Sequence, residues 1–450
     1  MRIVWLIVLA LLIGGGWWTY TRMERTPPQI GTLATPAFAS ASYEHEFRFS
    51  DGETGLRSAH VWLEAGGKVY ELAQEEFPGN PFSGASIDIE RPVEIAIDPK
   101  ALGIPDGQAT LHAEAHDFSW LDNTAHVAIP LTIDMKPPRV SLLTGLTYVR
   151  RGGTELAIYA VEDGVEKSGI QVGDHYFSGY VDPTDPKRRI AFYAIPAGAP
   201  EGVQPVLVAE DRAGNQAKVA LVANVMPRAF PEDTIPLSDE FMAGKVAELL
   251  GSFDGSSLDG YLKINREMRK ENDAALFELG QKSGPERVWT GAFTQMPNTH
   301  TGARFAERRS YVYDGKVVDT QTHMGFDFAS TSHAPVPAAN DGVVVFAGPL
   351  GIYGNTVVLD HGLGLFSLYG HLSEIGVEKG NPVSKGDALG KSGTTGLAGG
   401  DHLHYAMLLD GVFVDPIEWF DAKWIADHIE GKLTAAAQTQ SESVPAAPAR

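Results

Sequence analysis

The chain has 450 residues, no cysteine and a formal net charge of −21, with 57 acidic residues against 36 basic ones. An acidic chain without a basic block is a poor partner for phosphates, so we expect no nucleic-acid binding. The absence of cysteine excludes disulfides, thiolate metal ligands and a lipid-modified cysteine, and the length allows about three domains.

The first segment, residues 1–35, is interpreted as a transmembrane anchor and linker. Residues 3–20 carry no charge, and a helix over them would span about 27 Å, which is just enough for a bilayer core. Trp17, Trp18 and Tyr20 would suit the membrane interface. A cleaved signal peptide is the alternative, because Gly14, Gly15 and Gly16 resemble the small residues of a cleavage site. On either reading the chain is exported.

Two β-rich segments are predicted next, over residues 36–136 and 137–228. Apolar runs such as 59–64 and 93–97 alternate with Gly, Asp and Pro turns, a pattern typical of antiparallel sandwiches. The second segment is predicted to be immunoglobulin-like, because residues 206–215 resemble the late strand and turn of bacterial immunoglobulin-like modules. The weaker echo at 110–119 leaves that fold open for the first segment. Both are interpreted as spacers or docking modules, and a stable stalk without a further role is an equal alternative.

A helical connector is predicted over residues 229–285. Ser238 precedes Asp239 and Glu240, which together form an N-cap with an acidic first turn, and apolar residues recur at helical spacing as far as Gly251. A second helix is expected from about residue 257 to 279. At the other end of the chain, residues 433–450 are low in apolar bulk and are predicted to be disordered.

Two histidine motifs in the remaining segment indicate metal chemistry. His323 and Asp327 are four residues apart, and His402 and His404 are two apart. Side chains alternate along a strand, so each pair shares one face. A straight strand would hold His323 and Asp327 about 13 Å apart, so Gly325 is expected to bend the chain if both bind one ion. The two later histidines would project about 7 Å apart, so one can bind an ion while the other reaches its water.

Residues 289–420 resemble the M23 (LytM/lysostaphin-type) zinc metallopeptidases of bacterial cell walls. The motifs that carry this resemblance are His323-Met-Gly-Phe-Asp327, Tyr353-Gly-Asn-Thr-Val-Val-Leu-Asp-His361-Gly, Leu368-Tyr-Gly-His371-Leu, and Gly393-Thr-Thr-Gly followed by His402-Leu-His404.

The resemblance implies a ligand set and a catalytic pair. One zinc ion per chain would be held by His323, Asp327 and His404, and His371 and His402 would be the catalytic histidines. Three ligands and an open position are what a catalytic zinc requires. Other polar residues of the segment are interpreted as structural or surface residues: His333, Asn355 and His361.

The fold class predicted is therefore mainly β and multidomain. Sandwich units, 36–136 and 137–228, and a helical connector, 229–285, would precede a LytM-type antiparallel β catalytic domain over residues 286–432. Because all five site residues lie between 323 and 404, a fragment over 288–429 is expected to fold and bind zinc alone.

The function implied by the resemblance is a zinc metallo-endopeptidase that hydrolyses peptide cross-links of bacterial peptidoglycan. Its two histidines would act as acid/base and oxyanion stabiliser. The chain would span the inner membrane once near its N-terminus, with its bulk in the periplasm. A non-catalytic LytM-type activator of a cell-wall amidase is one alternative, and a zinc peptidase for protein substrates is another. The intact five-residue set favours an enzyme.

Overall fold

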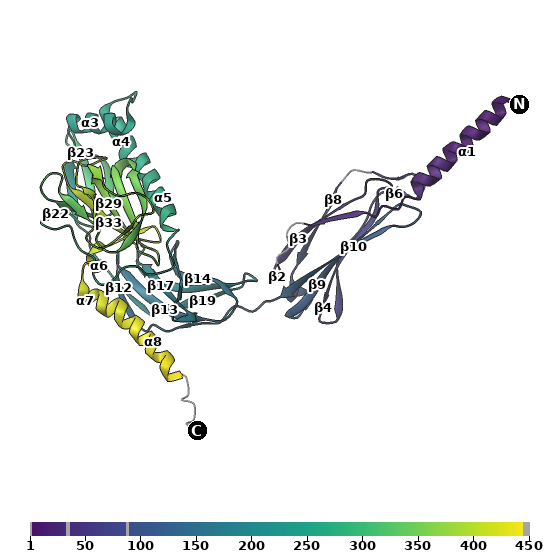
Figure 1. Ribbon diagram of the computed structural model, residues 1–450, viewed down its shortest axis with the longest axis horizontal. Coiled ribbons are helices and arrows are strands. Elements are labelled where there is room, and N and C mark those ends of the chain that lie inside the picture. The colour runs from purple at the N-terminus through teal and green to yellow at the C-terminus, as the bar shows by residue number, and fades with distance from the viewer. Residues whose placement is uncertain (1, 33–36, 87–89, 444–450) are drawn as a thin grey trace, which may run out of the picture. The chain divides into compact units, whose positions relative to one another are not determined.

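A computed structural model describes residues 2–32, 37–86 and 90–443 of the chain. It contains mainly β-strands arranged in several sheets, which confirms the predicted fold class. The chain divides into two compact units. Unit 1 comprises residues 1–138 with 210–216, and unit 2 comprises residues 139–209 with the chain from 217 onward. Figure 1 shows both units.

Unit 1 begins with helix α1 (Arg2–Arg22). The stretch Ile3–Arg22 has a mean hydropathy of 1.8, and none of it is buried within the structure. Its length and composition suit a membrane span, and a signal sequence near an N-terminus has the same properties.

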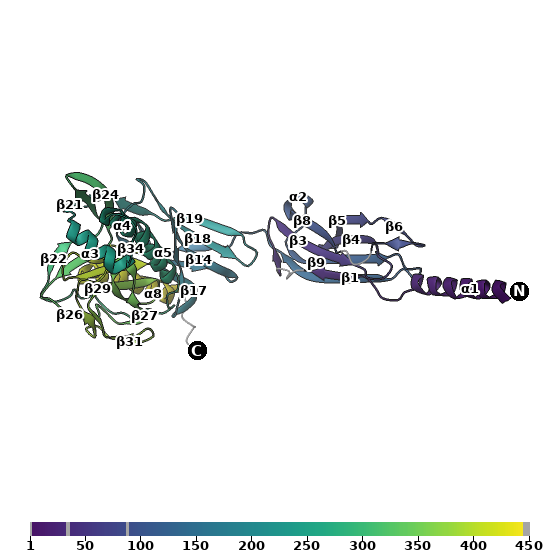
Figure 2. The same cartoon turned by 90° about the horizontal axis from the view of Figure 1, so that it is seen from above.

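The rest of unit 1 is built from two larger sheets, with strand orders β1-β3-β8 and β2-β10-β9-β4-β5, and a two-stranded sheet, β6-β7. Burial alternates along β3 and β9, which places Phe47, Phe49 and Leu111 in one core. The elements are β1 (Gln29–Thr32), β2 (Phe38–Ala39), β3 (Tyr43–Ser50), β4 (Leu56–Ala65), β5 (Lys68–Glu76), β6 (Gly79–Asn80), β7 (Gly84–Ala85), β8 (Arg91–Ile97), α2 (Pro99–Leu102), β9 (Gly107–Asp117) and β10 (Thr124–Ile133). Figure 2 shows the strands from above. The immunoglobulin-like assignments stay predictions.

Unit 2 opens with three small sheets, ordered β11-β13-β17-β16, β12-β20 and β15-β14-β18-β19. Their strands are β11 (Val140–Leu142), β12 (Thr147–Arg150), β13 (Thr154–Val161), β14 (Val165–Val172), β15 (His175–Ser178), β16 (Tyr180–Asp182), β17 (Asp185–Ala194), β18 (Pro205–Asp211), β19 (Gln216–Ala220) and β20 (Ala223–Met226).

A helical segment follows, as the sequence predicts. Helix α3 (Asp239–Leu250) is capped by Ser238, whose Oγ accepts a hydrogen bond from the Phe241 amide at 3.2 Å. Helix α4 (Ser257–Lys263) starts with a capping box between Ser256 and Asp259. It continues through a π-helical turn η1 (Ile264–Met268) into α5 (Arg269–Gly280).

The last part of unit 2 contains an eight-stranded sheet flanked by two three-stranded ones. The large sheet has the order β22-β25-β33-β29-β28-β27-β31, with β34 paired to β33, and the small ones are β21-β23-β24 and β26-β32-β30. The elements are β21 (Glu232–Pro236), β22 (His300–Ala303), β23 (Glu307–Tyr313), β24 (Lys316–His323), β25 (Phe326–Ala329), β26 (Pro335–Pro337), β27 (Gly342–Pro349), η2 (Gly351–Tyr353), β28 (Asn355–Asp360), β29 (Leu365–Leu372), β30 (Glu374–Ile375), β31 (Pro382–Val383), β32 (Ala388–Lys391), β33 (Leu403–Leu409), β34 (Val412–Val414), α6 (Pro416–Trp419), α7 (Ala422–Ile425) and η3 (Ala426–Glu430).

One hydrophobic core runs through unit 2 and crosses the predicted domain boundaries at 228 and 286. The ring of Phe192, in β17, lies 6.4 Å from that of Trp289 and 5.8 Å from that of Trp419. The Ser178 amide also donates to Asp410 Oδ2 at 2.8 Å, 232 residues further along the chain. The six-segment division of the chain stays a prediction, and a cut near residue 286 would separate these contacts.

The C-terminal segment corrects one expectation. Residues 433–450 were expected to be disordered, but helix α8 (Gly431–Ser443) covers the described part of them, and residues 444–450 lie outside the described residues. An alanine-rich stretch favours helix, and the Arg188 guanidinium holds the Ala436 carbonyl at 2.9 Å. Low apolar content therefore did not prevent local order here.

Candidate active site

His323 and Asp327 lie on two different strands rather than on one bent strand. His323 ends β24, in a three-stranded sheet, and Asp327 lies in β25, in the eight-stranded sheet. The chain changes sheet at Gly325. A Cβ there would lie 2.6 Å from the Tyr405 carbonyl oxygen and 2.9 Å from His404 Nε2, so only glycine fits. The expected bend at Gly325 is thus a change of sheet.

Strand register brings His404 to the same place. His404 lies directly opposite Asp327 in the β25–β33 pair, so both side chains project from one face. Three distances of 3.0 Å join His323 Nε2, Asp327 Oδ1 and His404 Nδ1 pairwise. The three predicted ligands, far apart in sequence, therefore form one compact triangle.

This triangle fits a zinc ion. Ligand atoms around a tetrahedral zinc with bonds of about 2.0–2.1 Å lie about 3.3 Å apart. His323 Nδ1 donates to the Arg304 carbonyl at 3.1 Å, so Nε2 faces the triangle and would offer its lone pair to an ion in the neutral ring. Burial would raise the pKa of Asp327, but the charge and hydrogen bond of His323 outweigh it, and hydrogen bonds from His402 and His404 add to them, so the pKa is held well below its usual range.

The two predicted catalytic histidines border the triangle. The rings of His371 and His402 lie 4.8 Å apart, and His402 Nε2 is 3.4 Å from Asp327 Oδ1. His371 Nδ1 donates to the Thr395 carbonyl and His402 Nδ1 to the Gly400 carbonyl, both at 2.8 Å. With Nδ1 donating, the Nε2 of a neutral His371 is free to accept a proton, while the Nε2 of His402 faces the Asp327 carboxylate. His371 also has a φ of 61°, an unusual backbone conformation of the kind found at functional sites.

Burial, followed by the neighbouring His402 and His404, lowers the pKa of His371 well below its ordinary value. Burial also acts to lower the pKa of His402, but the hydrogen bond to Asp327 and that carboxylate's charge outweigh it, so this pKa is raised. The two histidines thus sit in different electrostatic environments within one site.

Arg309 was not identified from the sequence. Its Nη2 lies 3.0 Å from Asp327 Oδ2, and its Nε lies 3.0 Å from Glu307 Oε1. Because the guanidinium occupies one oxygen of Asp327, the other oxygen is left for the triangle. Arg309 comes from β23, which pairs with β24 in the hairpin that delivers His323. The only sequence signal was a basic residue on a strand, which ordinarily indicates a solvated face.

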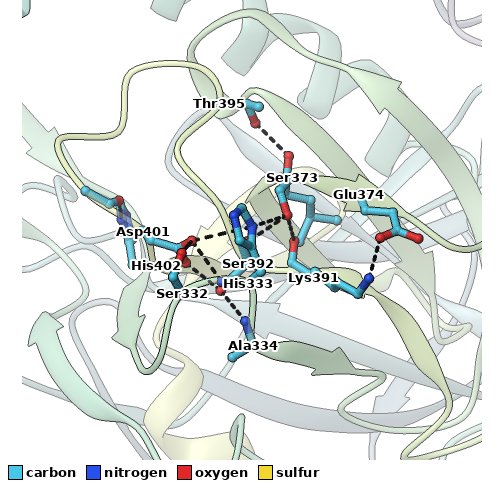
Figure 3. A network of polar contacts seen from close by, with 12 residues as sticks. Ser332, His333, Ala334, Ser373, Glu374, Lys391, Ser392, Thr395, Asp401 and His402 are labelled. Atoms are coloured by element: carbon cyan, nitrogen blue, oxygen red, sulfur yellow. Dashed lines mark hydrogen bonds and ion pairs between the residues drawn. The ribbon is translucent and has the colours of Figure 1, made fainter.

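Asp401, the residue before His402, fixes the local loop, as Figure 3 shows. Its Oδ1 accepts from Ser392 Oγ at 2.6 Å, and its Oδ2 accepts from Ser332 Oγ and the His333 amide, each at 3.0 Å. Three chain segments therefore meet on one carboxylate next to His402.

The connector helices also contribute to the site. Lys245 Nζ donates to the Thr394 carbonyl at 2.8 Å, and Glu248 Oε1 accepts from the Gly396 amide at 2.8 Å. Helix α3 thus holds the turn whose Thr395 carbonyl orients His371. Its apolar residues were predicted to be packing stripes, and its polar contacts to this turn were not anticipated.

A cavity of about 420 Å³ opens over the triangle. Its lining includes all five predicted site residues together with Arg309, and side chains from α3, α4 and α5 form part of its wall: Phe241, Tyr261 and Arg269. Positions outside residues 286–432 therefore shape the space in which a substrate would lie.

Three polar residues that were interpreted as structural make structural contacts. His361 is fully buried between the Asp341 carbonyl and Ser367 Oγ. Asn355 donates to the Leu372 carbonyl at 3.0 Å. His333 is exposed and lies 3.0 Å from Ser373 Oγ.

Comparison with known proteins gives these residues a context. The sequence model of Peptidase family M23 matches residues 321–416. The chain is 42% identical over 95 residues to the DD-carboxypeptidase/endopeptidase Mpg of Neisseria meningitidis, which is 21% of this chain and 22% of that protein. It is 32% identical over 157 residues to the peptidoglycan DD-endopeptidase ShyA of Vibrio cholerae, which is 35% of this chain and 34% of ShyA.

Among solved structures, one similar chain is described as a putative peptidase M23 from Pseudomonas aeruginosa. The similarity has a TM-score of 0.39 and 22% identity, and it covers 60% of this chain and 94% of that one. The chain spans only about a fifth to a third of the lengths of the curated relatives named above. Residues 321–416 of this chain are a domain of peptidase family M23.

Proposed function

We propose that this protein is a membrane-anchored zinc metallo-endopeptidase that hydrolyses peptide cross-links of peptidoglycan on the outer side of the inner membrane. One observation carries the proposal. The triangle of His323, Asp327 and His404 and the two histidines beside it line one open cavity in a domain of a metallopeptidase family. The name of ShyA supplies the substrate class, since it is described as a peptidoglycan DD-endopeptidase, and Mpg is described as a DD-carboxypeptidase/endopeptidase.

Zinc is the metal that suits the donor set. Two imidazole nitrogens and one carboxylate oxygen are ligands that zinc accepts in catalytic sites with an open fourth position. A zinc ion held there supplies Lewis acidity, which activates water and polarises a carbonyl at neutral pH.

The proposed roles of the chain's own residues follow from their hydrogen bonds. His371 directs a free Nε2 at the reacting region, so it can accept a proton from water and return it to the leaving amine, and His402 can do the same once it has lost the proton that it shares with Asp327. The same imidazoles can stabilise negative charge that develops on the carbonyl oxygen. Arg309 would keep Asp327 in a one-oxygen binding mode.

The experiment uses the purified full chain in detergent, because residues 139–285 contact the M23 domain. Peptidoglycan sacculi are incubated with wild type, with His404→Ala and with wild type after chelation, and the released muropeptides are separated. We expect cross-linked dimers to become monomers only with metal-loaded wild type, with recovery when zinc is added back. A zinc-loaded chain that cuts nothing alone but stimulates an added amidase would establish the activator function instead.

The anchor is tested separately by washing membranes at high salt and alkaline pH. An uncleaved α1 should keep the protein in the membrane fraction, because extraction would expose an apolar span to water. Amino-terminal sequencing that finds a mature start near Trp17 would identify a signal peptide instead.

A further inference from the structure

A second cluster of metal-ligating side chains lies in unit 1. Glu24, Asp51 and Asp117 each offer a carboxylate oxygen, and these oxygens lie within 4.8 Å of one another. Their exposed fractions are 6%, 5% and 0%. Three buried carboxylates at such distances repel strongly unless positive charge compensates them.

The surrounding hydrogen bonds hold the cluster, and the Arg22 guanidinium lines the same pocket as Glu24, with its Nε and Nη1 buried and without hydrogen-bond partners. Asp51 Oδ1 accepts from the amides of Glu53 and Gly55 at 3.1 and 2.5 Å. Asp117 Oδ1 accepts from the amides of Ser119 and Asn123, both at 3.0 Å. Within the described part of the chain, no lysine or arginine forms an ion pair with any of the three carboxylates.

Glu24 provides a second, independent sign of a missing partner. Its Oε1 accepts from Thr54 Oγ1 at 2.9 Å, but its Oε2 is buried and has no hydrogen-bond partner. Burial, followed by hydrogen bonding to Glu53 and Asp117 and by the charge of Asp51, raises the pKa of Glu24 to about 8, so the ion-free carboxyl is largely protonated at neutral pH and gives up its proton when a cation binds. In the ionised form of Glu24 this buried oxygen lacks a donor, which is costly, and a bound cation would supply the missing partner.

We propose that Glu24, Asp51 and Asp117 bind a calcium ion. All the donors are hard oxygens, with no histidine or cysteine among them, which favours calcium or magnesium over zinc. Because the residues are more than nine-tenths buried, an ion that enters must give up most of its water. Magnesium dehydrates reluctantly and demands a strict octahedron, whereas calcium accepts irregular carboxylate and carbonyl sites.

The ion would join three segments at one end of the unit 1 sandwich. Glu24 lies in the segment that leaves α1, Asp51 follows β3, and Asp117 ends β9. The Glu24 carbonyl accepts a hydrogen bond from Ser119 Oγ at 3.0 Å, so two of the segments are already in contact without an ion. Bound calcium would fix the chain that connects α1 to the β-strands. The family-matched residues take no part in this site.

The test measures calcium on the full chain in detergent at constant ionic strength, in buffer freed of calcium by resin so that the active-site metal is not stripped. Equilibrium dialysis with radioactive calcium should give one ion per chain, with half-saturation at about 10⁻⁴–10⁻³ M, as for extracellular sites. At ten times the dissociation constant, the open state should be about elevenfold less populated. Hydrogen exchange of the Ser119, Trp120 and Asn123 amides should therefore slow about tenfold.

Glu24→Gln is the deciding variant, because it keeps the size of the side chain and the bond from Thr54 while removing the charge. It should lose calcium uptake and the calcium-dependent slowing of exchange. Glu44→Gln, at an exposed position of β3, is the matched control and should behave like wild type. Glu53→Gln, which leaves Glu24 in place, should weaken uptake less and checks that any loss is not general misfolding.

Three outcomes would overturn the proposal. One is no calcium uptake by wild type at about 5 mM, which lies above the range of extracellular sites. Another is uptake that survives Glu24→Gln unchanged. The third is equal uptake and protection with magnesium, which would exclude the calcium assignment.

Discussion

The two clusters of side chains that could bind a metal, one in each unit, differ in donor type and in surroundings. These two properties determine which ion a site suits and whether a bound ion can reach a substrate. His323, Asp327 and His404 offer two nitrogens and one oxygen, whereas Glu24, Asp51 and Asp117 offer oxygens only. Both clusters are largely buried. The first borders a cavity shared with two further histidines and a guanidinium, whereas the pocket that Glu24 lines holds no histidine among the described residues. The donors select the ion, and the open neighbouring space is what allows a bound ion to meet a substrate.

Removing a ligand from the first cluster should have the largest effect. His404→Ala should lose its bound zinc and its peptidoglycan hydrolysis together, because two donors cannot hold the ion. Elemental analysis of the purified protein checks this, with His175→Gln as a control on a distant strand of unit 2. Stoichiometric zinc in the His404→Ala protein would refute the ligand assignment.

Substitution of the two histidines beside the first cluster should separate zinc binding from catalysis. His371→Ala and His402→Ala should retain zinc while hydrolysis falls by about 10²-fold or more, since proton transfer is lost. Zinc content and the rate of muropeptide release are measured on the same sample. Wild-type hydrolysis by either variant would remove that residue from the proposed mechanism.

Substitution of Arg309 tests whether its ion pair with Asp327 contributes to zinc affinity. Arg309→Met should raise the zinc dissociation constant by about 10–100-fold, because Asp327 loses the partner that holds its second oxygen. Competition with a coloured chelator measures this without reference to activity. Arg308→Met is the matched control, since Arg308 is exposed and its guanidinium pairs with Glu232 at 3.8 Å. Equal zinc affinity in both variants would make Arg309 a packing residue only.

Asp410 is a buried carboxylate that accepts a hydrogen bond from a backbone amide instead of facing a metal site, and it gives the last contrast with the two clusters. Burial raises the pKa of Asp410 to about 7, above its unfolded value, so ionising it in the folded state costs stability as pH rises from about 4 to about 7. Asp410→Asn keeps the bond from the Ser178 amide and suits the positive φ of 45°.

The variant should be close to wild type in stability at pH 4 and more stable at pH 8 by about 3–4 kcal/mol. Thermal unfolding at both pH values provides the measurement, and Asp163→Asn at the surface is the control. A stability difference that does not change with pH would show that the charge of Asp410 carries no cost.

Some features could be predicted because their physics is local. The apolar composition of α1, the Ser238 cap and the alternation that pairs His402 with His404 all depend on neighbours within a few residues. The family motifs added the grouping of His323, Asp327 and His404, which the structure brings to within 3.0 Å. Alternation alone had suggested that His323 and Asp327 belong to one strand.

What the sequence by itself determined is the chemistry available: nitrogen and oxygen donors, no thiolate, one apolar helix and a mainly β chain. Tertiary structure decided which of these groups meet. The change of sheet at Gly325, the approach of Arg309 to Asp327 and the convergence of Glu24 with Asp51 and Asp117 all join distant segments. Such contacts depend on strand register and on burying apolar faces together, and neither is encoded in a short window of residues.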